Sequence, residues 1–139
     1  MVQCKYLLIR CMDFRLNKKI IDWLTENGIL QDTDFISIVG ACKDLAIYPF
    51  SSESRYLMSM IDLAITKHGV KTIILTQHQD CAGYGGQACF ATAKDEKACL
   101  IADLKKVKGN IWQKHAQLEI KMFLICQQDK NWNFEEIKD

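Results

Sequence analysis

Two short segments of this chain carry side chains of the types that bind metal ions in proteins. Residues 11–15 read Cys-Met-Asp-Phe-Arg, and residues 78–81 read His-Gln-Asp-Cys. Two thiolates and one imidazole form a ligand set that zinc accepts, and three protein ligands leave one position of a tetrahedral ion open, as in catalytic rather than structural zinc sites. We therefore expect one Zn²⁺ per chain, bound by Cys11, His78 and Cys81.

Asp13 and Arg15 place a carboxylate and a guanidinium beside the expected metal. Zinc lowers the pKa of a bound water to about 7, and a nearby carboxylate can orient the resulting hydroxide. Arg15 can hold that carboxylate through a bidentate, charge-assisted pair. If the chain stays extended past Arg10, residues 11, 13 and 15 project to one side. The sequence leaves open whether Asp13 pairs with Arg15 or ligates the metal, and the same pair could simply cap the first helix.

Strand-like and helix-like segments alternate along the chain, which predicts an α/β fold with a mostly parallel sheet. We expect a single three-layer domain over residues 1–139, with about four or five strands in the order 2-1-3-4, flanked by helices. Apolar residues at helical spacing mark three helices around residues 16–24, 57–65 and 100–112, the third broken near Gly109-Asn110. Strand-like runs occupy about 4–10, 34–39, 71–77 and 119–126, with a short antiparallel edge strand at 132–137.

Both candidate ligand segments follow a predicted buried strand, and such ends are where open α/β sheets build their sites. In the order 2-1-3-4 the first and third strands are neighbours, so Cys11 arrives beside His78 and Cys81. Residues 78 and 81 would face opposite sides of a continuing strand, and they can converge only if the backbone turns. Gly83, Gly85 and Gly86 make such a turn easy.

Composition excludes several classes of protein. The 139 residues include 18 Lys and Arg against 17 Asp and Glu, a net charge of +1 that gives no support to a nucleic-acid or membrane-surface role. Apolar runs fall short of the roughly 20 residues of a membrane span, and we see no signal-peptide pattern. Seven irregularly spaced cysteines favour reduced thiols over a disulfide framework. We expect a cytoplasmic protein.

Three further cysteines and the other two histidines have simpler interpretations, whereas the sequence leaves the roles of Cys42 and Cys89 open. We expect Cys4 and Cys126 in strands and Cys99 on a helix to be small buried hydrophobic residues. His68 precedes a helix-ending glycine, where a histidine needs no further role. His115 could move protons only if it lay near the site.

The spacing Cys-x-Asp-x-Arg at 11–15 and His-x-x-Cys at 78–81, on strands of this order, resembles the zinc site of the β-class carbonic anhydrases. The resemblance covers most of the chain, including Gly40 after the second strand. It implies that zinc is bound by Cys11, His78 and Cys81, and that zinc-bound hydroxide hydrates carbon dioxide reversibly to bicarbonate. It also implies that the Asp13–Arg15 dyad guards the fourth zinc position, that Gly40 borders the substrate, and that the protein is a homodimer or a higher homo-oligomer.

The chain also departs from the family pattern. Ser37-Ile38-Val39-Gly40 stands where the family has Arg-Asn-Ala-Gly, and Ala82 replaces the glycine after the second cysteine. The residues before Cys11 are too few for the amino-terminal arm of the family and its glutamine. An alternative is therefore a zinc-binding protein of this fold without hydratase activity, or one acting on a related small electrophile such as carbonyl sulfide. The segment 46–50, Ala-Ile-Tyr-Pro-Phe, is a candidate pocket or interface wall.

Overall fold

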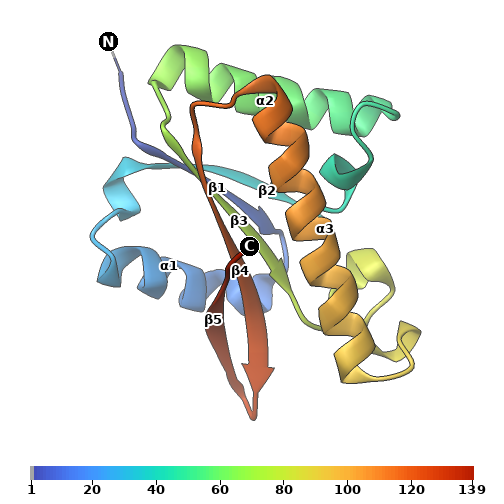
Figure 1. Cartoon of the computed structure of the whole chain (residues 1–139). Coiled ribbons are helices and arrows are strands. Elements are labelled where there is room, and N and C mark those ends of the chain that lie inside the picture. The colour runs from blue at the N-terminus through green and yellow to red at the C-terminus, as the bar shows by residue number, and fades with distance from the viewer. Residues whose placement is uncertain (1) are drawn as a thin grey trace.

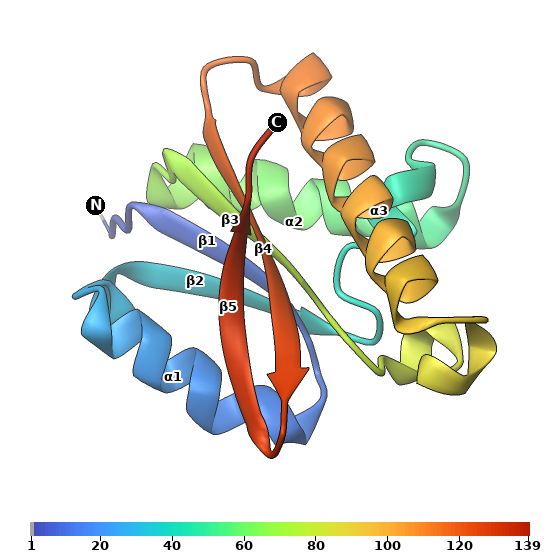
Figure 2. The same cartoon turned by 60° about the horizontal axis from the view of Figure 1, so that its bottom comes forward.

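Five strands form one sheet in the order β2-β1-β3-β4-β5 in the computed structural model, which describes residues 2–139 (Figures 1 and 2). The first four strands run parallel, and β5 pairs with β4 antiparallel. The strands are β1 (Tyr6–Cys11), β2 (Thr33–Ile38), β3 (Thr72–His78), β4 (Glu119–Gln128) and β5 (Asn131–Ile137). The predicted fold class, strand order and antiparallel edge strand are confirmed.

β3 is the central strand, and its sequence explains why. All seven of its residues, Thr-Ile-Ile-Leu-Thr-Gln-His, are buried. A parallel strand covered by helices on both faces needs such a continuous run, with little room for solvated side chains. The polar residues at its carboxyl end are therefore buried as well, which prepares that end of the strand for chemistry.

Three helices cover the two faces of the sheet. α2 (Ser52–His68) and α3 (Ala93–Lys114) pack on one face, and α1 (Asn17–Glu26) packs on the other, as both views show. Ser51 caps α2 through a capping box, and Gly69 ends it in the left-handed conformation. The glycine predicted to end the helix after His68 is confirmed, whereas the helix begins several residues before the predicted apolar run at 57–65. Among residues 2–139, no helix is both long enough and apolar enough to cross a bilayer.

Some predicted details were wrong. α3 continues unbroken through Gly109 and Asn110, and the Asn110 amide donates a hydrogen bond to the Leu45 carbonyl at 3.1 Å. Asn110 therefore anchors the helix to the neighbouring 3₁₀ turn at Asp44–Ile47. Cys4 lies before β1 rather than in a strand, and it is half-buried, as are Cys99 and Cys126.

Leu75 on β3 offers a test of this packing. Its side chain is fully buried in the cluster between the sheet and helices α2 and α3. Leu75→Ala should lower the free energy of unfolding by about 2–5 kcal/mol, because it removes buried contacts and leaves a cavity. Urea unfolding followed by circular dichroism measures the change.

The matched control is Leu63→Ala on α2, because that leucine is 58 % exposed. Its effect should stay within about 0.5 kcal/mol. Equal losses for the two leucines would contradict the packing described here.

Candidate metal centre

The three predicted ligands meet at the carboxyl ends of β1 and β3. Cys11 is the last residue of β1, His78 is the last of β3, and Cys81 follows one turn later. The two sulfur atoms are 3.8 Å apart, and one ligand atom from each of the three residues lies within 4.8 Å of the others. All three side chains are at most 5 % exposed.

The donor geometry fits a zinc ion. Two sulfurs bound at about 2.3 Å in a tetrahedral site are separated by about 3.8 Å, which is the separation observed between Cys11 and Cys81. His78 Nδ1 lies 2.7 Å from the Gln79 carbonyl oxygen, which can only accept, so Nδ1 donates. The lone pair of the neutral ring is then on Nε2, which is buried with no hydrogen-bond partner. A buried acceptor without a partner, facing two sulfurs, is the arrangement that a metal ion satisfies.

The two thiols do not have the same acidity. A hydrogen bond from Cys81 is the main cause that lowers the pKa of Cys11, helped by His78 and by backbone N–H groups of Asp13 and Gly40. The same sulfur–sulfur contact, together with burial, raises the pKa of Cys81. One negative charge is thus stabilised at the sulfur pair even without a cation. A bound metal would stabilise the second thiolate.

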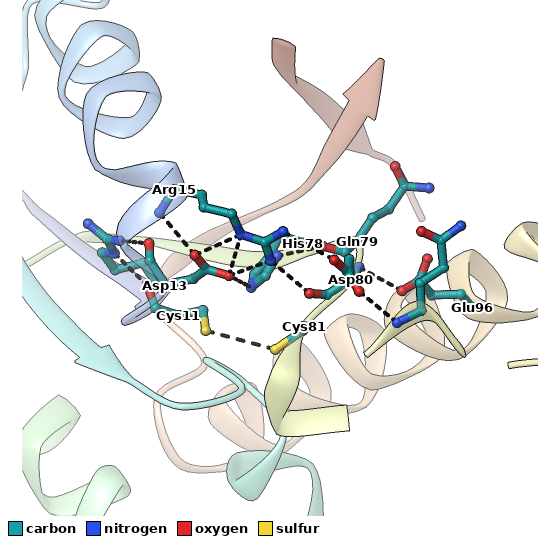
Figure 3. A network of polar contacts seen from close by, with 10 residues as sticks. Cys11, Asp13, Arg15, His78, Gln79, Asp80, Cys81 and Glu96 are labelled. Carbon is teal, nitrogen blue, oxygen red and sulfur yellow. Dashed lines mark hydrogen bonds and ion pairs between the residues drawn. The ribbon is translucent and has the colours of Figure 1, made fainter. Parts of the chain in front are cut away.

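Asp13 pairs with Arg15 in this structure (Figure 3). The Arg15 Nη2 atom lies 2.7 Å from Asp13 Oδ2, and Nε lies 3.1 Å from Oδ1. The expectation of an extended chain past Arg10 is wrong, because β1 ends at Cys11 and a 3₁₀ turn follows at Phe14–Leu16. Asp13 caps this turn by accepting the Arg15 backbone N–H at 2.9 Å. The dyad is therefore built by a local turn rather than by strand alternation.

The dyad also faces the candidate metal ligands. Asp13 Oδ2 lies 3.9 Å from His78 Nε2. The hydrogen bond from Arg15 lowers the pKa of Asp13, so that carboxyl stays ionised at neutral pH. An ionised carboxylate can only accept hydrogen bonds, and this one is aimed at the space beside the three ligands.

Arg15 is held from several sides. Its Nη1 atom lies 3.1 Å from Asp80 Oδ2, and Nη2 donates to the Asp80 carbonyl at 3.0 Å. The guanidinium carbon lies 5.4 Å from the centre of the Trp132 ring, in cation–π contact. Asp80 is thus a partner of the dyad.

Sequence reasoning missed two residues that support the site. Glu96 on α3 is 1 % exposed, and its carboxylate accepts the Asp80 backbone N–H at 2.7 Å. The buried Arg10 donates to the Cys11 carbonyl at 2.7 Å and to the Asp13 carbonyl at 3.0 Å. Glu96 had a detectable signal, because an acidic residue stands there on the buried stripe that continues through Leu100 and Leu104. Arg10 had none beyond its place next to Cys11.

A surface cavity of about 460 Å³ opens beside the dyad. Most of its wall is apolar, and the lining residues are Cys11, Met12, Asp13, Phe14, Arg15, Val39, Ala82 and Gly83. Gly40 lies behind this wall. Its Cα would be only 2.8 Å from a Cβ added at Gly83, so the two glycines allow two loops to approach closely. His115, which could move protons only near the site, is not among these residues. Its Nε2 atom lies 2.6 Å from Asp62 Oδ1.

Glu96 provides a test of this support. Glu96→Ala should destabilise the protein by about 1–3 kcal/mol, because the Asp80 N–H loses its buried acceptor. Glu96→Gln keeps an acceptor oxygen and should cost less. Urea unfolding measures both variants, and an equal loss for the two would contradict the role given to this hydrogen bond.

Comparison with known proteins agrees with the geometry. Residues 1–138 match a protein-family model described as "Putative carbonic anhydrase". An uncharacterized protein of Rickettsia conorii (strain ATCC VR-613 / Malish 7) is 29 % identical over 122 residues, which cover 86 % of this chain and 66 % of that protein. This chain thus spans a little under two thirds of the length of that relative.

Solved structures share the fold. β-Carbonic anhydrase isoform I of Trichomonas vaginalis superimposes with a TM-score of 0.62 at 15 % identity, covering 96 % of this chain and 82 % of that one. One of two β-carbonic anhydrases described as tetrameric, from Sordaria macrospora, gives 0.57 at 14 % identity, covering 96 % and 81 %. At such low identity these likenesses establish the fold alone. The family match, which extends over almost the whole chain, shows that this protein belongs to the "Putative carbonic anhydrase" family.

Proposed function

We propose that this protein is a zinc-dependent carbonic anhydrase, which hydrates carbon dioxide reversibly to bicarbonate. The observation that carries the proposal is the unpartnered Nε2 atom of His78, which faces two sulfurs 3.8 Å apart and a carboxylate oxygen at 3.9 Å. Cys11, His78 and Cys81 would hold one Zn²⁺. The fourth position would then face Asp13.

The metal, when bound, would act as a Lewis acid that makes a deprotonated water available near neutral pH. The residues of this chain would direct that nucleophile. Asp13, kept ionised by Arg15, would accept its remaining proton in a hydrogen bond and so turn a lone pair toward the substrate. Asp80 and Trp132 hold Arg15 in place, so the acceptor is oriented before substrate arrives.

The cavity suits a small apolar substrate. Met12, Phe14 and Val39 line it beside the dyad, and such a wall favours carbon dioxide over water. Bicarbonate is charged, so the same wall favours release of the product. Gly40 would contribute by its backbone, since it lies behind the wall and allows Gly83 to approach.

We also propose that the functional protein is a homodimer or a larger homo-oligomer. Phe14 is 80 % exposed and Phe50 is 87 % exposed, which is unusual for large apolar side chains. Phe14 lines the cavity, so a second subunit on this face would cover the entrance to the site. The tetrameric β-carbonic anhydrases that share the fold are consistent with this assembly.

We place the protein in a reducing compartment such as the cytoplasm. All seven cysteines, which lie within the described residues, are free. The Cys11 and Cys81 sulfurs are close enough that oxidation would threaten them as metal ligands.

Asp13→Asn tests the proposed reaction. An amide cannot act as the same ionised acceptor, so kcat for hydration should fall by about 100-fold or more while zinc content stays unchanged. Stopped-flow hydration of carbon dioxide and metal analysis of zinc-loaded protein measure the two quantities. Asp95→Asn, at an exposed position at the start of α3, is the matched control and should leave both unchanged.

Cys81→Ser should lose zinc and activity together. If wild-type protein hydrates carbon dioxide no faster than Asp13→Asn and Cys81→Ser, the proposed reaction is wrong. Zinc retained in the wild type with no hydration between about pH 6 and 9 would indicate instead a non-hydrating zinc protein or one acting on carbonyl sulfide.

Light scattering at about micromolar concentration tests the assembly. The wild type should elute at the mass of a dimer or larger. Phe50→Glu places a charge on segment 46–50, the interface wall predicted from the sequence, and should shift the protein toward monomer. Phe35→Glu, at a 41 % exposed position on β2, is the control. A monomeric wild type would count against the proposal.

A further inference from the structure

A second group of potential metal ligands lies at the opposite end of the sheet. Cys4, Asp34 and His68 each offer a donor atom, and the three atoms lie within 4.8 Å of one another. Figure 2 shows the beginning of β1 beside the end of α2, away from the carboxyl ends of β1 and β3. The group therefore shares no residue with the candidate metal centre described above.

Three separate elements hold these donors. Asp34 is on β2, where it is paired in register with Leu7 of β1, and His68 is the last residue of α2. The backbone N–H of Cys4 donates to the His68 carbonyl at 3.0 Å, which fixes Cys4 beside the helix end. Gly69 ends the helix at φ 71°, so the position of His68 is defined by a regular helix terminus. The cluster is thus positioned by backbone contacts.

The histidine and the carboxylate are already in contact. His68 Nδ1 lies 2.7 Å from Asp34 Oδ2. Taken alone, this pair is an ordinary hydrogen bond at the end of a helix. The thiol of Cys4, from a third segment, changes its character, because sulfur, imidazole nitrogen and carboxylate oxygen together form a donor set typical of zinc.

We propose that Cys4, Asp34 and His68 form a second zinc-binding site, distinct from the site of Cys11, His78 and Cys81. Binding would release the Cys4 thiol proton to solvent and leave the His68 ring protonated only at Nε2, with any other ring proton passing to solvent, so that sulfur, Nδ1 and a carboxylate oxygen become ligands. The present hydrogen bond between His68 and Asp34 would be replaced by two bonds to the cation. The fourth ligand would come from solvent.

An ion can reach this site. The side chains of His68 and Asp34 are 37 % and 31 % exposed, in contrast to the buried ligands of the other centre. A groove of about 620 Å³ adjoins Cys4, and its lining residues are Gln3, Cys4, Lys5, Asp32, Gly69 and Lys71. The positive charges of Lys5 and Lys71 would favour an anion from the solvent as the fourth ligand. The Asp32 carboxylate accepts the Lys5 backbone N–H at 2.8 Å and offsets part of their charge.

Such an ion would join the segment before β1 to β2 and to the end of α2. Apart from an ion, this end of the sheet is held by backbone pairing and by the contacts of the Asp34 side chain with His68 and of the Asp32 side chain with the Lys5 N–H. Because zinc would bind the folded chain and not an equivalent preformed site in the unfolded chain, it would stabilise this end of the domain. The expected role is therefore structural or regulatory rather than hydrolytic.

The experiment uses the full chain with the other centre removed by Cys11→Ser and Cys81→Ser. Co²⁺ is the probe, because its thiolate charge-transfer band reports a bound cysteine and is independent of carbon dioxide hydration. This background should bind one Co²⁺ per chain, and Zn²⁺ should displace it and raise the thermal midpoint. Adding Cys4→Ser should remove the band and weaken binding by more than about 100-fold, and adding His68→Gln should weaken it similarly.

Cys99→Ser, a change at another half-buried cysteine, is the matched control and should leave binding unchanged. Far-ultraviolet circular dichroism shows whether each variant is folded. The single variant Cys4→Ser, with the other centre intact, should bind one ion per chain where the wild type binds two. The proposal is overturned if the folded background binds no Co²⁺, or if Cys4→Ser binds it as the background does. If wild-type protein binds the ion at Cys4, Asp34 and His68 but does not hydrate carbon dioxide, only the proposed enzymatic function is contradicted.

Discussion

Parallel pairing of β1 with β3 is the constraint on which the candidate metal centre depends. The two strands are separated by α1, β2 and α2 in the chain, yet they are neighbours in the sheet. Their carboxyl ends therefore meet at the point where the strand order changes direction, which is where open α/β sheets bind ligands. Cys11 and His78 are the last residues of these strands, so one pairing brings them together. The turn that follows β3 then returns Cys81 to within 3.8 Å of Cys11, sulfur to sulfur.

Around Cys11, His78 and Cys81, the protein holds charged side chains in place before a metal or substrate binds. Arg15 lies between Asp13 and Asp80 and beside the ring of Trp132. Asp80 is held in turn by the buried carboxylate of Glu96. Because each group in this series is restrained by the next, the Asp13 carboxylate beside the candidate metal ligands has little freedom to reorient (Figure 3). Catalysis by zinc of the kind proposed requires such an acceptor, since the hydroxide must be oriented as well as formed.

The two ends of the sheet present metal ligands in different environments. Cys11, His78 and Cys81 are buried, and the histidine acceptor there has no other partner. Cys4, Asp34 and His68 are half-buried, and Asp34 and His68 are already joined by a hydrogen bond. A buried, unsatisfied donor set favours a permanently bound ion, whereas a solvated set that satisfies itself favours an exchangeable one. The difference in burial thus separates a candidate catalytic position from a candidate structural or regulatory one.

The sequence by itself determined the fold class, the strand order, the carboxyl end of α2 and the candidate ligands Cys11, His78 and Cys81. These features depend on local patterns, namely apolar runs of strand length, capping residues and metal-binding side chains directly after strands. The 3₁₀ turn at Phe14–Leu16 could not be read from strand alternation, because the Asp13 side chain competes with the extended backbone by capping its own turn. Tertiary structure alone decided that Glu96 supports Asp80 and that Cys4 meets Asp34 and His68. Those contacts join residues far apart in the chain, and only the packing of helices against the sheet brings them together.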